Sequence, residues 1–259
     1  MTELDNSVHA CKDPAVERPR IGIIQSRGLG DLFIALPIAR HYWLQGNDIV
    51  WPICEEFLAT MRACAPWVRW IPVGTDPRGE FFWDRPMRVF KYNDVSEDRI
   101  INLYQYLSNR PQDSDPDIFP ILKFDQYKYA VSGVPFKQKW TLGEFLVRDQ
   151  AEEDRVYSAV VDPSAQGYIV VHTQGSDRVV HLDLSEAEAQ GYQVITIREG
   201  VTENATAWLR VIEGAEALYL IDSCFSNLVD QLDISVDKTF IRRSKMDLTP
   251  VLGSQWTYM

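Results

Sequence analysis

Apolar positions along the chain form short runs that alternate with longer segments of helical spacing. The apolar run at residues 21–25 predicts a strand, and residues 31–44 predict a helix that Pro37 is expected either to kink or to begin. The pattern continues with a strand, a helix and a strand at residues 47–52, 55–65 and 68–73. This alternation predicts a parallel sheet.

Between residues 75 and 120 the alternation of strand and helix patterns is less regular. Residues 81–89 are aromatic and rich in turn formers, residues 96–107 are expected to form a helix, and residues 111–120 a loop. In the charged segment that follows, Thr141 precedes Glu144 by three residues, which is the spacing of a capping box. We therefore expect a helix to begin at Thr141 and to join the two halves of the chain.

Strands and helices alternate again in the second half. The expected strands are residues 168–172, 193–197, 217–221 and 238–241, and the expected helices are residues 185–190, 205–214 and 223–232. Because each half begins with the same strand, turn and helix, the predicted fold class is α/β with two Rossmann-like domains. The predicted divisions are a flexible arm, an N-terminal domain, a linker helix and a C-terminal domain at residues 1–19, 20–140, 141–163 and 164–259.

Composition and charge narrow the classes of partner. The 259-residue chain has a formal net charge of -11, which repels nucleic acid and anionic membranes at long range but leaves room for a local basic groove. No apolar run approaches the roughly 20 residues that cross a bilayer, and residues 1–20 lack the apolar core of a signal peptide. A cytoplasmic protein without an integral membrane segment is therefore expected.

The sequence does not indicate a metal site. The four cysteines form no Cys-x-x-Cys pair and have no histidine couple beside them, so they are expected to be reduced and mostly structural. Asp113, Asp115 and Asp117 resemble a calcium loop but lack its later glycine and glutamate, which favours a solvated turn. The aromatic residues 81–83 are expected in the core or in a cleft wall, with a sugar-stacking platform as the alternative.

The first candidate site is the glycine-rich loop between the first strand and the first helix. Gly28 and Gly30 let the backbone approach a ligand beside a helix N-terminus, which favours an anion. The loop does not match a dinucleotide fingerprint, because Phe33 stands where the third glycine belongs. Asp31 is then either a functional carboxylate or the cap of the helix that follows.

The second candidate site lies where the strand at 217–221 passes into a helix. The amides of the helix start, together with the Ser223 and Ser226 hydroxyls, are suited to holding a diphosphate. Ordinary capping by Asp222 or Ser223 is the alternative. Open parallel sheets bind ligands beyond the carboxyl ends of their strands, which favours a ligand at this position.

Two further strand ends in the second half carry polar groups. The loop after the strand at 168–172 contains His172, Thr173 and Arg178, of which Arg178 is suited to pairing with phosphate and His172 to donating a hydrogen bond. A solvated loop is the alternative. Glu199 follows the next strand, where an acidic group commonly accepts a hydrogen bond from a ribose hydroxyl.

The order of these motifs resembles the ADP-heptose:lipopolysaccharide heptosyltransferase family. Members of that family open with a strand, a small-residue loop that ends in Gly-Asp, and a helix that contains a proline, which Gly30, Asp31 and Pro37 match. Their later motif is Asp-Ser/Thr-Gly-x-x-His at a helix start. The second candidate site is similar to it, with Cys224 in place of the glycine and Asn227 in place of the histidine.

The resemblance implies a GT-B fold of two facing Rossmann-like domains and the activity of a glycosyltransferase. It implies that Asp31 is the catalytic base and that the first half binds the acceptor hydroxyl of a glycan, a lipid-linked glycan or, as the weaker alternative, modified DNA. The diphosphate of a nucleotide-sugar would lie near Ser223 and Arg178, and its nucleoside near Glu199. The expected donor- and phosphate-binding residues are Gly28, Gly30, His172, Thr173, Arg178, Glu199, Asp222, Ser223, Cys224, Ser226 and Asn227.

The resemblance also implies transfer with inversion at the anomeric carbon and without a metal. No cofactor is expected, because the nucleotide-sugar is a co-substrate.

Two other functions fit parts of the sequence. An enzyme that transfers sugar to a hydroxylated base in DNA would need a local basic groove, for which Arg85, Arg88 and Lys91 are candidates against the acidic balance of the chain. A GT-B module that binds a sugar or a partner protein without turnover is favoured by the replacements at Cys224 and Asn227. A salt-dependent shift with DNA would indicate the first function, and nucleotide binding without activity the second.

Overall fold

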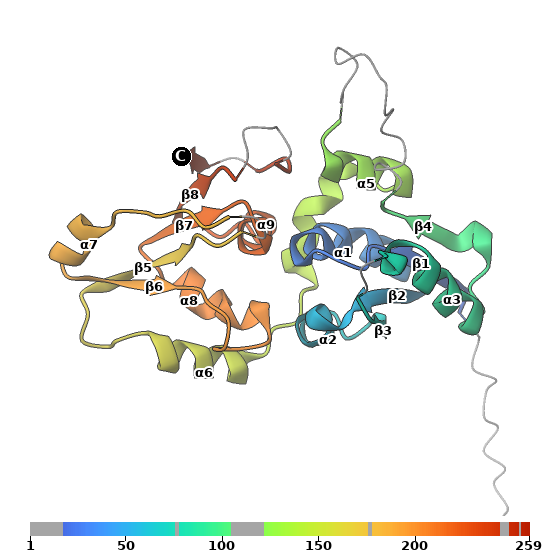
Figure 1. Ribbon diagram of the computed structural model, residues 1–259, viewed down its shortest axis with the longest axis horizontal. Helices are drawn as coiled ribbons and strands as arrows, with labels where there is room; N and C mark the ends of the chain where they lie inside the picture. The colour runs from blue at the N-terminus through green and yellow to red at the C-terminus, as the bar shows by residue number, and fades with distance from the viewer. Residues whose placement is uncertain (1–17, 76–77, 105–121, 176–177, 244–248, 254) are drawn as a thin grey trace, which may run out of the picture.

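The computed structural model describes residues 18–75, 78–104, 122–175, 178–243, 249–253 and 255–259. Its strands form two sheets in which neighbouring strands run parallel, connected by helices (Figure 1). The predicted α/β class with two parallel sheets is therefore confirmed. Residues 1–17 of the predicted arm and the predicted loop at 111–120 lie outside the described residues. The domain boundaries given above stay predictions.

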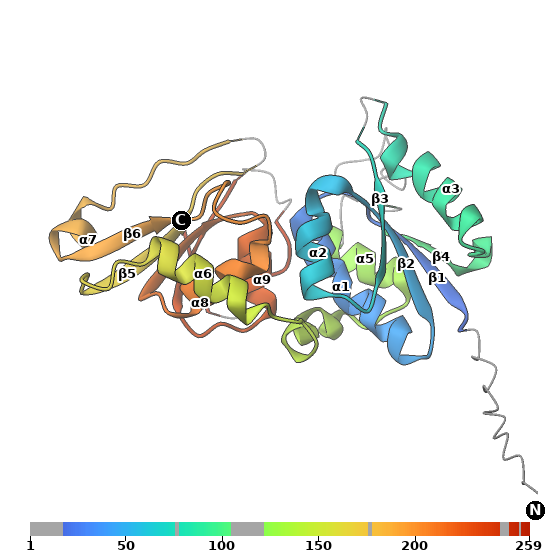
Figure 2. The same ribbon diagram turned by 90° about the horizontal axis from the view of Figure 1, so that it is seen from below.

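The first sheet has the strand order β3-β2-β1-β4. Its strands are β1 (Arg20–Ile24), β2 (Asp48–Cys54), β3 (Arg69–Val73) and β4 (Ile100–Asn102). The helices of this half are α1 (Leu29–Leu44), α2 (Leu58–Cys64), α3 (Asp84–Tyr92) and α5 (Phe124–Ser132), with short 3-10 turns at η1 (Glu55–Phe57), η2 (Glu80–Phe82) and η3 (Glu97–Arg99). Figure 2 shows α3 on one side of the sheet and α1 and α2 on the side that faces the second half. Helices on both faces explain why β1 and β2 are continuous apolar runs.

Two predictions in the first half are wrong. The helix expected at 96–107 is absent from its described part, where η3 leads into strand β4, which pairs with β1. The two isoleucines of β4 are β-branched and suit a strand, so pairing with β1 outweighs the helical spacing. The turn-rich segment at 81–89 contains most of helix α3. Phe90 of helix α3 is buried and covers Gly22 of β1. A Cβ added to Gly22 would lie 2.8 Å from the Phe90 ring.

Helix α1 begins at Leu29, and its first hydrogen bond runs from the Leu32 amide to the Gly28 carbonyl at 2.9 Å. Pro37 lies inside the helix, so the alternative that Pro37 marks its first turn is wrong. All residues of the segment 32–39 are buried. A helix that is buried all round is covered on every side, here by the first sheet and by the second half.

The second sheet has the strand order β6-β5-β7-β8-β9. Its strands are β5 (Gly167–His172), β6 (Tyr192–Thr196), β7 (Ala217–Ile221), β8 (Asp237–Ile241) and β9 (Trp256–Tyr258). The helices of this half are α6 (Gln150–Val160), α7 (Ser185–Ala189), α8 (Leu209–Glu213) and α9 (Cys224–Gln231), with a 3-10 segment η6 (Ala205–Trp208). The sequence does not predict β9, because three residues are too few to show an apolar pattern, and its pairing with β8 forms it.

The helix expected to begin at Thr141 begins later. Thr141 and Glu144 lie in the 3-10 segment η5 (Phe136–Glu144), where the Thr141 hydroxyl donates to the Gln138 carbonyl at 2.9 Å. Helix α6 starts after Asp149, whose carboxylate accepts from the Glu152 amide at 3.1 Å. The predicted capping box is therefore wrong, because an aspartate cap eight residues further on begins the helix.

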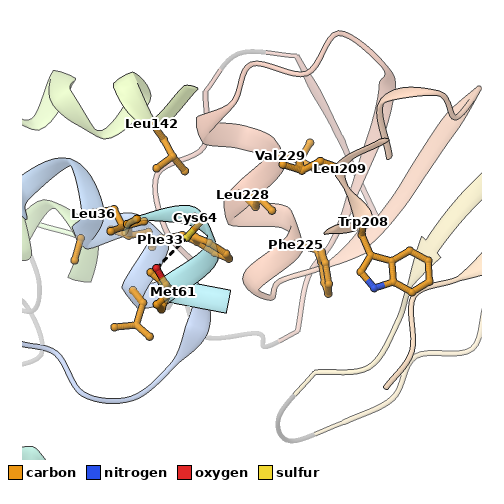
Figure 3. Close-up of a cluster of buried hydrophobic side chains, with 14 of the residues drawn as sticks. Phe33, Leu36, Met61, Cys64, Leu142, Trp208, Leu209, Phe225, Leu228 and Val229 are labelled. Carbon is orange, nitrogen blue, oxygen red and sulfur yellow. Dashed lines mark hydrogen bonds between the residues drawn. The ribbon is translucent and has the colours of Figure 1, made fainter. Parts of the chain in front are cut away.

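One apolar core spans both halves of the molecule. Figure 3 shows Phe33 and Leu36 of α1 on one side of it and Phe225 and Leu228 of α9 on the other. Figures 1 and 2 both show α1 and α9 lying between the two sheets. Burial of apolar area is the main favourable term in folding, so this contact stabilises each half against the other.

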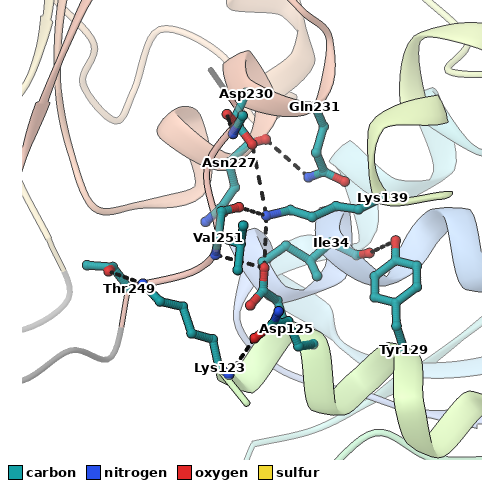
Figure 4. A network of polar contacts seen from close by, with 12 residues as sticks. Ile34, Lys123, Asp125, Tyr129, Lys139, Asn227, Asp230, Gln231, Thr249 and Val251 are labelled. Carbon is teal, nitrogen blue, oxygen red and sulfur yellow. Dashed lines mark hydrogen bonds and ion pairs between the residues drawn. The ribbon is translucent and has the colours of Figure 1, made fainter. Parts of the chain in front are cut away.

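A buried cluster of charges accompanies this core (Figure 4). Lys139 on η5 is buried, and its Nζ lies 2.9 Å from Asp125 Oδ2 and 3.9 Å from Asp230 Oδ2. Residues near the C-terminus complete the cluster: the Val251 amide donates to Asp125 at 2.9 Å and the Gly253 amide to Asp230 at 2.6 Å. Burying an ion pair is unfavourable unless further hydrogen bonds satisfy its members. The cluster therefore fixes α5, η5, α9 and the connection between β8 and β9 relative to one another.

Lys139→Met should lower the free energy of unfolding by about 3–5 kcal/mol, because the carboxylates on α5 and α9 would stay buried without a counter-charge. Urea unfolding followed by circular dichroism measures the loss. The matched control Arg155→Met removes the partly exposed ion pair with Glu152 and should cost less than about 1 kcal/mol. Losses of equal size in the two variants would contradict the structural role of the cluster.

Candidate functional site

Two helix starts meet at the boundary between the halves. Helix α1 follows β1 and helix α9 follows β7, so both begin at the carboxyl ends of inner strands of parallel sheets. A Cβ added to Gly30 would lie 2.9 Å from Asn227 Nδ2 and 3.3 Å from the Cα of Cys224. The close backbone approach expected at Gly30 is therefore made by α9. This edge of a parallel sheet is also where open α/β folds bind their ligands.

Gly28 sets the direction in which α1 starts. Its φ is 86°, a left-handed conformation that favours glycine, and an added Cβ would lie 2.7 Å from Asp31 Oδ2. Gly28 is the N-cap of α1, and no side chain caps this helix. Asp31 lies in the first turn, so the alternative that it caps the helix is wrong. Its carboxylate lies near the positive end of the helix dipole.

A lysine from α5 reaches the Asp31 carboxylate. Lys128 Nζ lies 3.2 Å from Asp31 Oδ1, and the side chains of Lys128 and Asp31 are 0% and 31% exposed. The same Nζ donates to Gln25 Oε1 at 2.5 Å. Burial lowers the pKa of Lys128, and the negative charges of Asp31 and Asp125 oppose that shift. The site thus combines a half-exposed carboxylate with a buried cation.

The start of α9 is held by its own side chains. Ser223 is the N-cap, and its amide donates to Ser226 Oγ at 3.0 Å in a capping box. Asn227 Nδ2 donates to the Ser223 carbonyl at 2.9 Å, so the helix itself uses this donor. The capping alternative is confirmed for Ser223. The Asp222 amide donates to the Ile241 carbonyl at 3.0 Å, which ties the end of β7 to β8.

His172 joins the end of β5 to this helix start. Its Nδ1 and Ser223 Oγ lie 3.0 Å apart and share a hydrogen bond, and its ring contacts the Phe225 ring edge-on at 4.8 Å between centroids. Burial lowers the pKa of His172 to about 4, so the imidazole is neutral at neutral pH. A neutral imidazole here orients the serine hydroxyl without adding charge. The thiol of Cys224 is also neutral, because burial raises its pKa to about 12.

The remaining predicted site residues lie further from this group of contacts. Thr173 is half-buried and its carbonyl accepts from the Val180 amide at 3.0 Å, so it holds the base of the loop. Arg178 and Glu199 are exposed, and within the described part of the chain no hydrogen bond or ion pair joins their side chains to Asp31, His172 or Ser223. The structure brings together the glycine loop, His172 and the α9 start, but not Arg178 or Glu199.

The aromatic residues predicted as core or cleft wall divide between the two environments. Phe81 is buried, whereas Phe82 and Trp83 are exposed. The Phe82 ring meets the Tyr104 ring edge-on at 4.9 Å, and the Arg27 guanidinium lies 5.5 Å from the centroid of Phe81. Of these three residues the core interpretation is therefore confirmed for Phe81, and Phe82 contacts Tyr104, whose hydroxyl accepts from the Arg27 amide at 3.0 Å.

The sequence offers little that would identify Lys128. Residues 125, 128, 129 and 132 share one helix face by their spacing, and all four are buried. That face consists of aspartate, lysine, tyrosine and serine, so a search for apolar periodicity passes over it. Only the three-dimensional arrangement shows that the lysine has a carboxylate partner on α1.

Within the described residues, no three His, Cys, Asp or Glu side chains come together in a group that could hold a metal ion. Over the same part of the chain, no helix has both the length and the apolar composition to cross a bilayer. The aspartates at 113, 115 and 117 lie outside the described residues. Cys64 and Cys224 are free thiols.

No family model matches the sequence, and no curated protein matches it. Solved structures match it in fold. E. coli ADP-heptose LPS heptosyltransferase II has a TM-score of 0.58 and 13% identity, covering 93% of this chain and 90% of that chain. The glycosyl transferase family 9 protein from Veillonella parvula has a TM-score of 0.57 and 11% identity, covering 93% and 86%. E. coli heptosyltransferase WaaC with ADP-2-deoxy-2-fluoro heptose has a TM-score of 0.53 and 15% identity, covering 93% and 92%.

At these identities the likeness shows the fold. The two parallel sheets and the helices between them are those of GT-B glycosyltransferases, as the sequence predicts.

Gly30→Ala should lower the free energy of unfolding by about 1–3 kcal/mol, because the new methyl group would overlap Asn227 and the backbone of α9. Alanine stabilises a helix more than glycine does, so a loss of stability in Gly30→Ala would show that the contact with α9 outweighs this preference. The control Gly143→Ala meets only a leucine methyl at 3.6 Å and should cost far less. Urea unfolding measures both, and a Gly30→Ala protein as stable as the wild type would refute the contact with α9.

His172 should make the protein less stable in acid. Its folded-state pKa of about 4 lies below the ordinary 6.5, so the unfolded chain takes up a proton first as the pH falls. The contribution of His172 to stability is complete above about pH 6.5 and is lost progressively toward about pH 4. His172→Asn should therefore show a smaller drop in unfolding free energy between these two values in urea titrations. An identical drop in the variant would show that His172 does not carry the effect.

Proposed function

We propose that this chain is a glycosyltransferase that moves a sugar from a nucleotide-sugar to an acceptor hydroxyl. The observation that carries the proposal is the contact between the α1 start, with its half-exposed Asp31, and the α9 start, in a fold shared with heptosyltransferases. A carboxylate and a set of helix amides on opposite sides of one boundary can serve the two ends of a displacement reaction.

The α9 start is the proposed site of the donor diphosphate. The amides of Cys224 and Phe225 belong to the first helical turn, and the Ser223 hydroxyl adds a hydrogen-bonding group held by neutral His172. Helix amides favour an anion without the cost of burying a counter-charge. WaaC was solved with ADP and with an ADP-2-deoxy-2-fluoro heptose, so ADP and ADP-sugars are the first ligands to test on this chain. Arg178 and Glu199 are exposed, and they would contact the nucleotide only from outside the site formed by His172, Ser223 and the α9 amides.

Asp31 is the proposed general base. Its carboxylate takes the proton of the acceptor hydroxyl while that oxygen attacks the anomeric carbon, and the bond from this carbon to the diphosphate breaks. The electron pair of that bond leaves with the nucleoside diphosphate, which the α9 amides stabilise. Attack opposite the leaving group inverts the anomeric centre. The scheme uses only groups of the chain and no metal or other cofactor.

The alternatives have weaker support. Arg85 and Arg88, candidates for a DNA groove, lie 3.6 and 3.0 Å from carboxylate oxygens of Glu80, which reduces the local positive charge. A module without turnover remains the competing function, because Cys224 and Asn227 depart from the heptosyltransferase pattern. The cytoplasmic location stays a prediction of the sequence.

Asp31→Asn should lower kcat for sugar transfer by about 10²–10⁴-fold, the usual contribution of a general base, and leave nucleotide affinity nearly unchanged. The proton acceptor is lost, whereas the diphosphate site on α9 is intact. Release of nucleoside diphosphate measures kcat, and calorimetry measures affinity. The matched control Asp84→Asn changes an aspartate in the first turn of α3 and should leave both unchanged.

A thermal-shift series with ADP, other nucleoside diphosphates and nucleotide-sugars decides between the enzyme and the module. A ligand at about 100 times its Kd stabilises the folded state by about 2.7 kcal/mol, which is easily detected. A shift together with turnover supports the glycosyltransferase. A shift without turnover of any tested donor favours the binding module, and no shift with any nucleotide contradicts both functions.

A further inference from the structure

We propose that Lys128 is the positioning residue of the catalytic base: it holds one oxygen of the Asp31 carboxylate, so that the other oxygen faces the acceptor hydroxyl. This inference rests on the proposed function. It assigns a role to a residue from α5, outside both sequence motifs.

The two oxygens of Asp31 have different surroundings. Oδ1 is buried and lies 3.2 Å from Lys128 Nζ, yet the side chain as a whole is 31% exposed. The exposure therefore belongs to the remainder of the side chain. Gly28 has no Cβ, and one placed there would lie 2.7 Å from Oδ2. A side chain at position 28 would thus press on Oδ2, whereas Lys128 forms an ion pair with the other oxygen.

Lys128 is itself held from several elements. Its Nζ donates to Gln25 Oε1 at the end of β1, and Gln25 Nε2 donates to the Arg27 carbonyl at 2.7 Å. The rings of Tyr104 and Phe124 lie 5.7 and 5.9 Å from the same Nζ. With a side chain that is 0% exposed, Lys128 has no surface from which to contact a substrate. Any effect of Lys128 on transfer therefore passes through its neighbours, of which Asp31 is the proposed base.

The charge of Lys128 depends on its partner. Burial lowers the pKa of this lysine, whereas the charges of Asp31 on α1 and Asp125 on α5 raise it. Tyr104 is neutral beside the pair, because burial raises its pKa far above the physiological range. The charge of Asp31 therefore favours the ammonium form of Lys128.

The pairing itself is tested without any ligand. In protein labelled with ¹³C at the lysine ε-carbons and assigned by triple-resonance methods, the Lys128 signal should titrate at a lower pH than the signals of surface lysines. Asp31→Asn removes the charge that opposes burial, so the titration should move to still lower pH. Asp84→Asn should leave it in place. An unchanged Lys128 titration in Asp31→Asn would overturn the proposed pairing.

The effect on catalysis is tested with ADP-heptose and water as acceptor, by following released ADP. Lys128→Met should lower kcat by about 10- to 100-fold, as loss of an orienting partner does, with the KM for ADP-heptose unchanged. In the Asp31→Asn background the same change should cause no further loss. Circular dichroism and the melting temperature check that each variant is folded, and the NMR titration needs no Lys128 variant.

The outcomes distinguish a failure of the proposed glycosyltransferase function from a failure of the positioning role of Lys128. Activity that survives Asp31→Asn contradicts the proposed function. Activity that is lost in Asp31→Asn but kept in folded Lys128→Met contradicts the positioning role alone. Independent losses that multiply in the double variant also overturn it, because Lys128 would then act on something other than Asp31.

Discussion

The contact between α1 and α9 at Gly30 is the constraint on which the rest of the structure depends. A Cβ at this position would meet both Asn227 and the backbone of Cys224, so only a glycine lets the two helix starts approach this closely. That approach buries Phe33 and Leu36 against Phe225 and Leu228 in one core. It also places the first turn of α1, which carries Asp31, against the start of α9. The close contact between α1 and α9 at Gly30 thus both packs the core and assembles the site.

Buried lysines secure this arrangement. Lys128 and Lys139 belong to the segment that leads from the first sheet toward the second, and each is wholly buried against a carboxylate. Lys139 joins α5 to α9 and to the chain end through Asp125 and Asp230, which favours one arrangement of the halves over a looser association of two domains. Lys128 acts within the first half, on Asp31. In a chain with a net charge of -11, these cations are matched to particular carboxylates and add no general positive surface.

Much of the fold is predictable because buried parallel strands leave a clear pattern. The strands β1, β2, β3, β5, β6, β7 and β8 all coincide with apolar runs. β4 and β9 have three residues each, and their pairing with a neighbouring strand determines them more than their own composition does. The start of α6 was misplaced, because Thr141 and Glu144 have capping-box spacing but lie in a 3-10 segment.

The candidate site is predictable in part for a related reason. Gly28, Gly30, Asp31 and the α9 start follow strands, so their motifs can be located along the sequence. His172 can be located in the same way from its strand end, and it shares a hydrogen bond with Ser223, whereas its role toward a ligand stays a prediction. Lys128 follows no strand and matches no motif. Its importance comes from a distant part of the chain, which a single sequence does not show. Contacts of this kind become visible only when the elements are placed in space.

The central claim is that the two helix starts form one site for a nucleotide-sugar and a base. The most direct measurement is a crystal structure of the protein with ADP-heptose bound. The account predicts that the diphosphate accepts hydrogen bonds from the Cys224 and Phe225 amides and that the anomeric carbon lies on the side of Asp31. A nucleotide bound away from α9, or bound there with its sugar directed away from Asp31, would contradict it.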